Sequence, residues 1–168
     1  MARLRWATGY ARRVISRARI TAPPVNVQRI AEAYGVEVIE ESFPDDISGA
    51  LHRGREQSVI AVNKGHHENR QRFTIAHELG HYLLHADSPA YYDHEHQVGV
   101  HFRASTAAGN WDVKEVEANR FAAELLMPRR MIIEAIQRSG AAEASTLAKL
   151  FEVSEEAMTY RLADIRIR

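Results

Sequence analysis

The sequence contains no cysteine and no hydrophobic run long enough to cross a membrane. The absence of cysteine excludes disulfides and thiolate metal sites, so any zinc must be held by histidine and carboxylate groups. No apolar stretch approaches the ~20 residues of a membrane-spanning helix. Arginines interrupt every hydrophobic cluster near the start, so no signal peptide is predicted. We therefore expect a cytoplasmic protein that does not associate with membranes.

Acidic residues are absent from the first part of the chain. Residues 1–29 hold seven arginines and no Asp or Glu, although the whole chain balances 22 basic against 22 acidic residues. That balance gives no overall field to recruit nucleic acid or anionic lipid. The basic start predicts an amphipathic surface helix, with an organellar transit peptide or a contact with nucleic acid or an acidic partner as alternatives. The residues expected to pack inward from this helix are Val14, Ile15, Ala18 and Ile20.

Hydrophobic periodicity predicts an α+β fold with a small sheet of about three strands. The 168 residues, 45% of them hydrophobic, suit one domain with a small appendage. A helix is expected over 3–19, and Asn26 is expected to cap a second helix that ends before Gly35. Strand patterns suggest a meander covered by helices on one face. The predicted strands are Val36–Glu40, Ile47–His52 and Ser58–Val62.

Helical patterns dominate the second half of the chain. Helices are predicted over 69–85 and 113–127, the latter ending at Pro128. The region 86–110 between them is polar and irregular, so we expect a long surface loop that is functional or mobile. A tail over 131–165 is predicted to be helical.

A metal-binding pattern lies in the helix predicted over 69–85. His77 and His81 are one helical turn apart on one face, so both imidazoles can reach one metal ion. Glu78 lies about 100° around the helix axis from His77, beside the metal, where it can take a proton from bound water. Gly80 costs about 1 kcal/mol in a helix relative to Ala, which suggests that another segment packs closely there. The spacing predicts a catalytic zinc site rather than a polar helix face with two incidental histidines.

The third ligand is sought on the next helix, where two carboxylates compete. Glu115 shares its stripe with Ala118 and Ala122, whose small side chains would allow a close approach to the histidine helix. A carboxylate on a buried stripe is unfavourable unless it is paired or bound to a metal, so Glu115 is preferred. Asn119, one turn later, is placed to orient a ligand. The alternative ligand Glu117 falls on a stripe expected to be solvated, with Lys114, Arg120 and Glu124.

Further histidines are weaker candidates. His85 lies one turn beyond His81, but three histidines of one straight helix cannot easily converge on a tetrahedral metal, so it is predicted to be a supporting or surface residue. His94, His96 and His101 fall in the expected loop, and any of them could still enter the site.

Two segments, Arg72–His85 and Glu115–Pro128, together resemble the ImmA/IrrE family of bacterial and phage metallopeptidases. Pro24–Val38 and Ile47–Ala50 also fit the opening helix and strands of that family. The resemblance implies a zinc site of two histidines and one glutamate, which falls on Glu115, with a fold that places zinc between two helices. It also implies cleavage of a helix-turn-helix repressor in a stress, DNA-damage or mobile-element response. On this basis residues 1–130 are predicted to form the metallopeptidase domain.

The remaining tail, residues 131–168, resembles a helix-turn-helix over Leu147–Leu162. Ser154 is expected to cap its second helix, and Val153 to fill the turn. Glu155 and Glu156 open the would-be recognition helix and would repel phosphate, so the tail is predicted to pack on the catalytic domain or to dock a partner. Direct nucleic-acid binding is the less favoured alternative. A protein that keeps the metal for structure only and acts through interactions is the other alternative.

Overall fold

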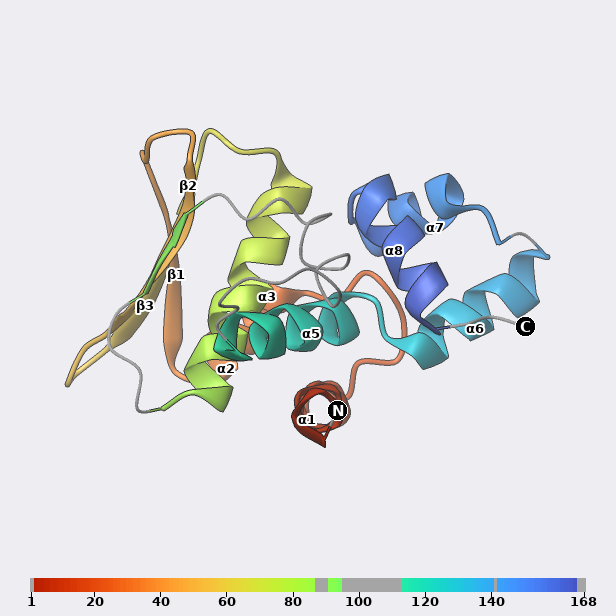
Figure 1. Ribbon diagram of the computed structural model, residues 1–168, viewed down its shortest axis with the longest axis horizontal. Helices are drawn as coiled ribbons and strands as arrows, with labels where there is room; N and C mark the ends of the chain where they lie inside the picture. Colours follow the sequence, from red (N-terminus) through yellow and green to blue (C-terminus); the bar gives the residue numbers. More distant parts are fainter. Residues whose placement is uncertain (1, 87–90, 95–112, 141, 166–168) are drawn as a thin grey trace.

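The computed structural model describes residues 2–86, 91–94, 113–140 and 142–165. A β-sheet forms one end of the molecule, α3 and α5 lie in the middle, and α6 to α8 form the other end (Figure 1). This arrangement confirms the predicted α+β class and the helical tail. The strands are β1 (Val36–Glu41), β2 (Ile47–Arg53), β3 (Ser58–Asn63) and β4 (Tyr91–His94). The helices are α1 (Ala2–Arg17), α2 (Val27–Ala33), α3 (Glu68–Leu84), α5 (Val113–Leu126), α6 (Arg129–Ser139), α7 (Ala144–Phe151) and α8 (Glu155–Ile165).

The sheet is not the predicted meander. Its strand order is β1-β3-β2-β4, with β1 parallel to β3 and β2 antiparallel to both β3 and β4. The connection from β1 to β2 is tied to the end of β3 by the side-chain amide of Asn63, which donates to three backbone carbonyls 2.9–3.2 Å away. Local strand patterns cannot predict this link, because the side chain and the carbonyls are 16 to 20 residues apart in the chain. The three carbonyls belong to Phe43, Pro44 and Ile47.

The fourth strand corrects the prediction that 86–110 is wholly irregular. Tyr91–His94 pairs with β2 and extends the sheet by one strand. Four residues are too few for an alternating pattern to be recognised, and the pairing edge is supplied by a strand far earlier in the chain. The rest of the predicted loop, at 87–90 and 95–112, lies outside the described residues.

Helix α3 lies against the sheet because β2 presents a glycine to it. A Cβ atom at Gly49 would lie 2.6 Å from both the Ala61 carbonyl oxygen and the Thr74 Cγ2, so no larger residue fits without a shift. At the other end of β2, Arg53 donates to the carbonyls of His81 and His85 at 2.8 and 3.2 Å. The His81 carbonyl also accepts the helical hydrogen bond from the His85 amide, and His85 is the residue that follows the last residue of α3. The sheet therefore fixes both the position and the end of the histidine helix.

Helices α3 and α5 touch at Gly80, as the cost of a glycine at that position suggested. A Cβ atom at Gly80 would lie 3.1 Å from Phe121 Cδ1 and 3.2 Å from the Cα atom of Ala118. Ala118 and Ala122 are fully buried, which confirms that small residues on α5 allow the two helices to approach. This contact sets the separation of the histidines on α3 from the carboxylates on α5.

Helix α1 is the predicted basic amphipathic helix and packs against α5. Val14 and Ile15 are buried, together with Ala7 and Ala11. Ala18 is exposed, contrary to the prediction, because the helix ends one residue earlier and the chain turns away.

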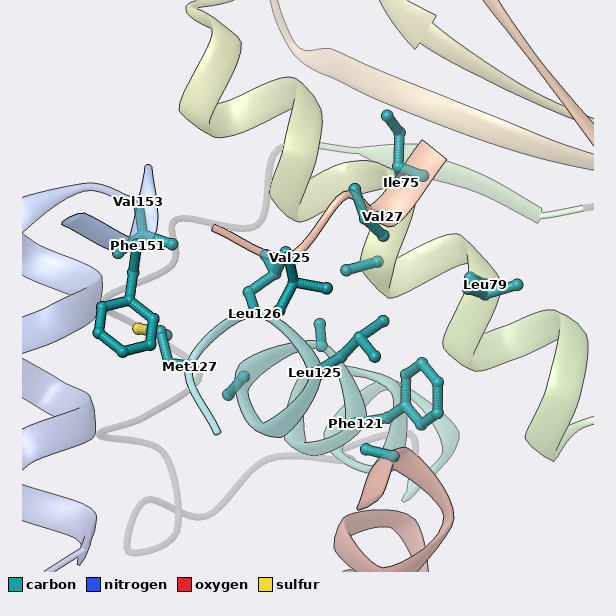
Figure 2. Packing of buried hydrophobic residues seen from close by; sticks show 14 of the residues in the cluster. Val25, Val27, Ile75, Leu79, Phe121, Leu125, Leu126, Met127, Phe151 and Val153 are labelled. Carbon is teal, nitrogen blue, oxygen red and sulfur yellow. The ribbon is translucent and has the colours of Figure 1, made fainter. Parts of the chain in front are cut away.

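The tail packs on the end of α5 through a second apolar group. Phe151 and Val153 face Met127, which follows the last residue of α5, and Val25 and Leu126 lie next to them (Figure 2). The predicted cap is present, because Ser154 Oγ accepts a hydrogen bond from the Ala157 amide at 3.1 Å. The tail is therefore continuous with the hydrophobic core.

Ion pairs of one buried glutamate also join α1 and the tail to α5. The carboxylate of Glu124 on α5 lies between Arg161 of α8 and Arg12 of α1, the latter with a 2.8 Å contact. Glu124 was expected on a solvated stripe, but it is only 2% exposed. The prediction failed because α1 and α8 bring two arginines to that face, from 112 and 37 residues away in sequence. No helix of the described part of the chain is both long and apolar enough to span a bilayer.

Gly80→Ala tests the contact between α3 and α5. Alanine improves helix propensity by about 1 kcal/mol, but its methyl group would press on the backbone of α5, and overpacking costs about 1–3 kcal/mol. We expect a lower free energy of unfolding in urea titrations. The matched control is Gly9→Ala on α1, where nothing lies within 4 Å of the new Cβ atom and the change should stabilise. Equal stabilisation by both substitutions would show that the helices do not touch tightly at Gly80.

Candidate metal centre

Three side chains from α3 and α5 converge between the two helices. The Nε2 atoms of His77 and His81 are 2.9 Å apart. The carboxylate of Glu115 lies 3.2 Å from His77 Nε2 and 3.1 Å from His81 Nε2. Tetrahedral zinc with ligands at about 2.0–2.1 Å places its donor atoms roughly 3.3 Å apart. The three residues could therefore hold one metal ion, and all their ligand atoms lie within 4.8 Å of one another.

The contact of His77 with Asn119 determines which ring nitrogen of His77 carries the hydrogen. Its Nδ1 atom lies 2.9 Å from Asn119 Oδ1 in a buried contact. An amide oxygen accepts only, so Nδ1 carries the hydrogen and Nε2 presents a lone pair toward Glu115. Asn119 was predicted to orient a ligand from one turn beyond Glu115, and its position agrees with that expectation.

The far side of His81 is held by a longer chain of buried groups. His81 Nδ1 lies 3.2 Å from His85 Nδ1, and His85 Nε2 lies 2.9 Å from Glu117 Oε2. A glutamate at the end of this chain accepts from His85 Nε2, which leaves His85 Nδ1 free to accept from His81 Nδ1. His81 Nδ1 then carries the hydrogen, and His81 Nε2 presents a lone pair toward Glu115 as well. His85 is thus a buried supporting residue, one of the two positions predicted for it.

Glu117 corrects the sequence prediction. It was expected on a solvated stripe, but it is 3% exposed and contacts His85. The stripe argument treated α5 as having one buried face, whereas α3 and the other helices cover most of its circumference. The only sequence signal that could have revealed the pair was the unexplained third histidine on α3.

The surroundings of the site favour the deprotonated forms of the ligands, which are the forms that bind metal ions. Burial lowers the pKa of His81 from 6.5 to about 4, although the nearby Glu115 carboxylate favours its charged form. Burial alone would raise the pKa of Glu115, but the adjacent imidazoles of His77 and His81 hold that pKa below its ordinary range. At neutral pH the site thus combines a neutral imidazole with a carboxylate. Three acceptor atoms about 3 Å apart repel one another unless a cation lies between them.

Glu78, the predicted proton acceptor, lies on α3 directly after His77 and is fully buried. It is not one of the three residues whose ligand atoms converge, and its place beside the metal stays a prediction. The side chain of His94 and all of His96 and His101 lie outside what the structure describes, so their entry into the site stays a prediction as well.

The lowered pKa of His81 predicts a loss of stability in mild acid after metal removal by a chelator. As the pH falls, the unfolded chain takes up this proton first, because its pKa of 6.5 exceeds the folded value of about 4. The stabilisation is therefore complete above pH ~6.5 and is lost toward pH ~4. Urea titrations should give a free energy of unfolding lower by about 2 kcal/mol at pH ~4.5 than at pH ~7.

The control for this pH dependence is His81→Gln, which removes the group while the other histidines remain. Its stability should fall less over the same pH range. Equal losses in the two proteins would show that His81 is not the group responsible.

Comparison with known proteins supports the resemblance drawn from the sequence. The chain matches the peptidase family described as the IrrE N-terminal-like domain over residues 31–163. It is 35% identical over 112 residues to the radiation response metalloprotease IrrE of Deinococcus radiodurans, covering 65% of this chain and 32% of that protein. It is 24% identical over 140 residues to the metallopeptidase ImmA of Bacillus subtilis, covering 83% of this chain and 76% of that protein.

One solved structure shares the fold over most of the chain. A Mycobacterium tuberculosis transcriptional regulator superposes with a TM-score of 0.66 at 16% identity, covering 94% of this chain and 46% of that one. At that identity the likeness concerns the fold alone. The chain spans about a third of the length of the two IrrE proteins it matches, 32% and 37%. With the family match covering most of its length, the protein belongs to the peptidase family of IrrE N-terminal-like domains.

Proposed function

We propose that this protein is a zinc-dependent endopeptidase in which His77, His81 and Glu115 hold the metal. The observation that carries the proposal is the meeting of two imidazole lone pairs and a carboxylate at one point, with separations of 2.9–3.2 Å. Two histidines and a glutamate leave a fourth position of a tetrahedral ion open, as in catalytic zinc sites. Zinc, when bound, supplies Lewis acidity that polarises a peptide carbonyl and lowers the pKa of water.

Glu78 is proposed as the general base and then the general acid. Its carboxylate takes a proton from the attacking water and delivers it to the nitrogen of the departing peptide. The proton leaves an O–H bond and enters an N–H bond, so Glu78 ends the cycle ionised as it began. Its complete burial keeps bulk water from competing for that proton.

The groups behind the ligands are proposed to orient them. Asn119 holds the His77 ring, and the His85–Glu117 pair holds the His81 ring, each through the nitrogen that faces away from the metal. Such partners fix the ring orientation and raise the basicity of the ligand, and their loss costs about 10–100-fold in metal affinity.

A helix-turn-helix repressor is the proposed substrate, which would place the enzyme in the cytoplasm. The support is the family resemblance and two relatives, a radiation response metalloprotease and an immunity region protein of Bacillus phage phi105 that is 30% identical over 105 residues. Residues 1–130 would form the catalytic domain, and residues 131–168 a tail that docks the partner. Exposed Glu155 and Glu156 at the start of α8 favour this role over DNA binding.

Metal analysis of purified variants tests the ligand assignment. His77→Ala and Glu115→Gln should abolish or strongly weaken zinc binding, because each removes a donor. Glu117→Gln keeps all three donors but replaces the acceptor at the end of the His85 chain, so zinc should bind about 10–100-fold more weakly. Full zinc content in Glu115→Gln would contradict the assignment.

Glu78→Gln tests the mechanism. The variant should keep its zinc and its thermal stability, and it should cleave at least about 100-fold more slowly, the scale of general-base contributions. The assay uses a helix-turn-helix repressor as the substrate, followed by mass spectrometry of the fragments. Cleavage by Glu78→Gln at the rate of the unaltered protein would end the proposal. Rapid digestion of casein by the unaltered protein would instead indicate a general peptidase.

A further inference from the structure

A second cleft lies away from the metal centre, between α1, the end of α5 and the start of α6. Its volume is about 680 Å³, within the range of about 300–1,000 Å³ typical of ligand sites. Its apolar residues come from α1, from α6 and from the segments that follow α1 and α5, and Ile20, just beyond α1, is half-buried and so the most accessible of them. The apolar lining consists of Ile15, Ile20, Pro128 and Met131.

Arginines dominate the charged residues of this cleft. Four of them line it, against two glutamates, and both glutamates already have arginine partners. Glu124 is paired with Arg12 and with Arg161 beneath, and Glu134 is paired with Arg130. Within the part of the chain that the structure describes, the side chains of Arg19 and Arg129 form neither hydrogen bonds nor ion pairs. The cleft therefore carries an excess of positive charge. The four arginines are Arg12, Arg19, Arg129 and Arg130.

Two of these arginines occupy positions that are unfavourable for the fold itself. Arg129 and Arg130 are the first two residues of α6, which has no acidic residue in its first turn and no side-chain cap at Pro128. Cations at a helix N-terminus oppose the helix dipole and cost about 0.3–1 kcal/mol each. Local choices that oppose the fold are typical of functional positions.

We propose that this cleft binds an acidic peptide segment that carries an apolar side chain. The arginines at the rim would pair with its carboxylates, and the apolar residues would take the single hydrophobic side chain between them. A phosphodiester backbone could use the arginines but gains nothing from Ile20 and Met131, so nucleic acid is the poorer match. The site lies at the C-terminal end of α5, nine residues or roughly 14 Å along the helix from Glu115. It is separate from the metal centre, and occupancy does not depend on catalysis.

Fluorescence anisotropy with defined probes tests this inference on the intact chain. The probe is a short labelled peptide with one leucine between runs of aspartate. Matched probes replace the leucine by serine or the aspartates by lysine, and a short labelled DNA duplex is the nucleic-acid probe. Repeating the titration with Glu78→Gln separates binding from cleavage, so that the inference can fail or hold independently of the peptidase proposal.

Arg129→Glu is the decisive variant. Glutamate is favoured in the first turn of a helix, so this change should not lower the melting temperature, yet it should weaken binding of the acidic leucine peptide about tenfold. Arg55→Glu makes the same charge change on an exposed residue of the β2–β3 turn and should leave the affinity within about twofold. The serine probe should bind at least about tenfold more weakly than the leucine probe.

Several outcomes would overturn the inference. One is absence of binding of the leucine peptide to the folded protein, and another is equal weakening by Arg129→Glu and Arg55→Glu. Equal affinity for the serine and leucine probes would show that the apolar residues take no part. Tighter, Arg129-dependent binding of the DNA duplex would assign the cleft to nucleic acid instead.

Discussion

The close approach of α3 and α5 at Gly80 is the contact on which the site depends. The histidines lie on one helix and the third candidate ligand on the other, so the distance between the helix axes decides whether the three donors meet. That distance is set where Gly80 faces the backbone of Ala118, so closely that an additional methyl group would lie 3.1–3.3 Å from its neighbours on α5. The sheet holds α3 from its other side, because Gly49 allows close packing and Arg53 ties the end of the helix to β2.

Helix α5 organises the polar interior of the molecule as well as its core. Its buried polar residues meet partners on other elements. Asn119 contacts His77 of α3, Glu117 contacts His85 just beyond α3, and Glu124 lies between arginines of α1 and α8. Buried charges of this kind are tolerated only when they are paired. The same helix therefore joins the candidate metal centre, the basic N-terminal helix and the tail.

Most of the local structure could be predicted from the chain. The spacing of His77 and His81, the caps at Asn26 and Ser154, and the helix stop at Pro128 each depend on interactions within a few residues. The predicted ligand Glu115 was also well placed, but part of the reasoning was wrong, because Glu117 and Glu124 on the supposedly solvated stripe are buried too. Which residues of α5 are buried depends on how many other elements pack around this helix. The periodicity of a single helix cannot indicate how many elements surround it.

The sequence by itself therefore determined the helices, three of the four strands, the histidine pair and its adjacent glutamate, since all of these follow from backbone periodicity and local hydrogen bonding. Only the tertiary structure decided the order of the strands and the pairing of β4. It also decided the contact of His85 with Glu117, the buried arginine pairs of Glu124 and the basic cleft between α1 and α6. Each of these joins residues that are far apart in the chain, and their proximity results from the packing of whole elements against one another.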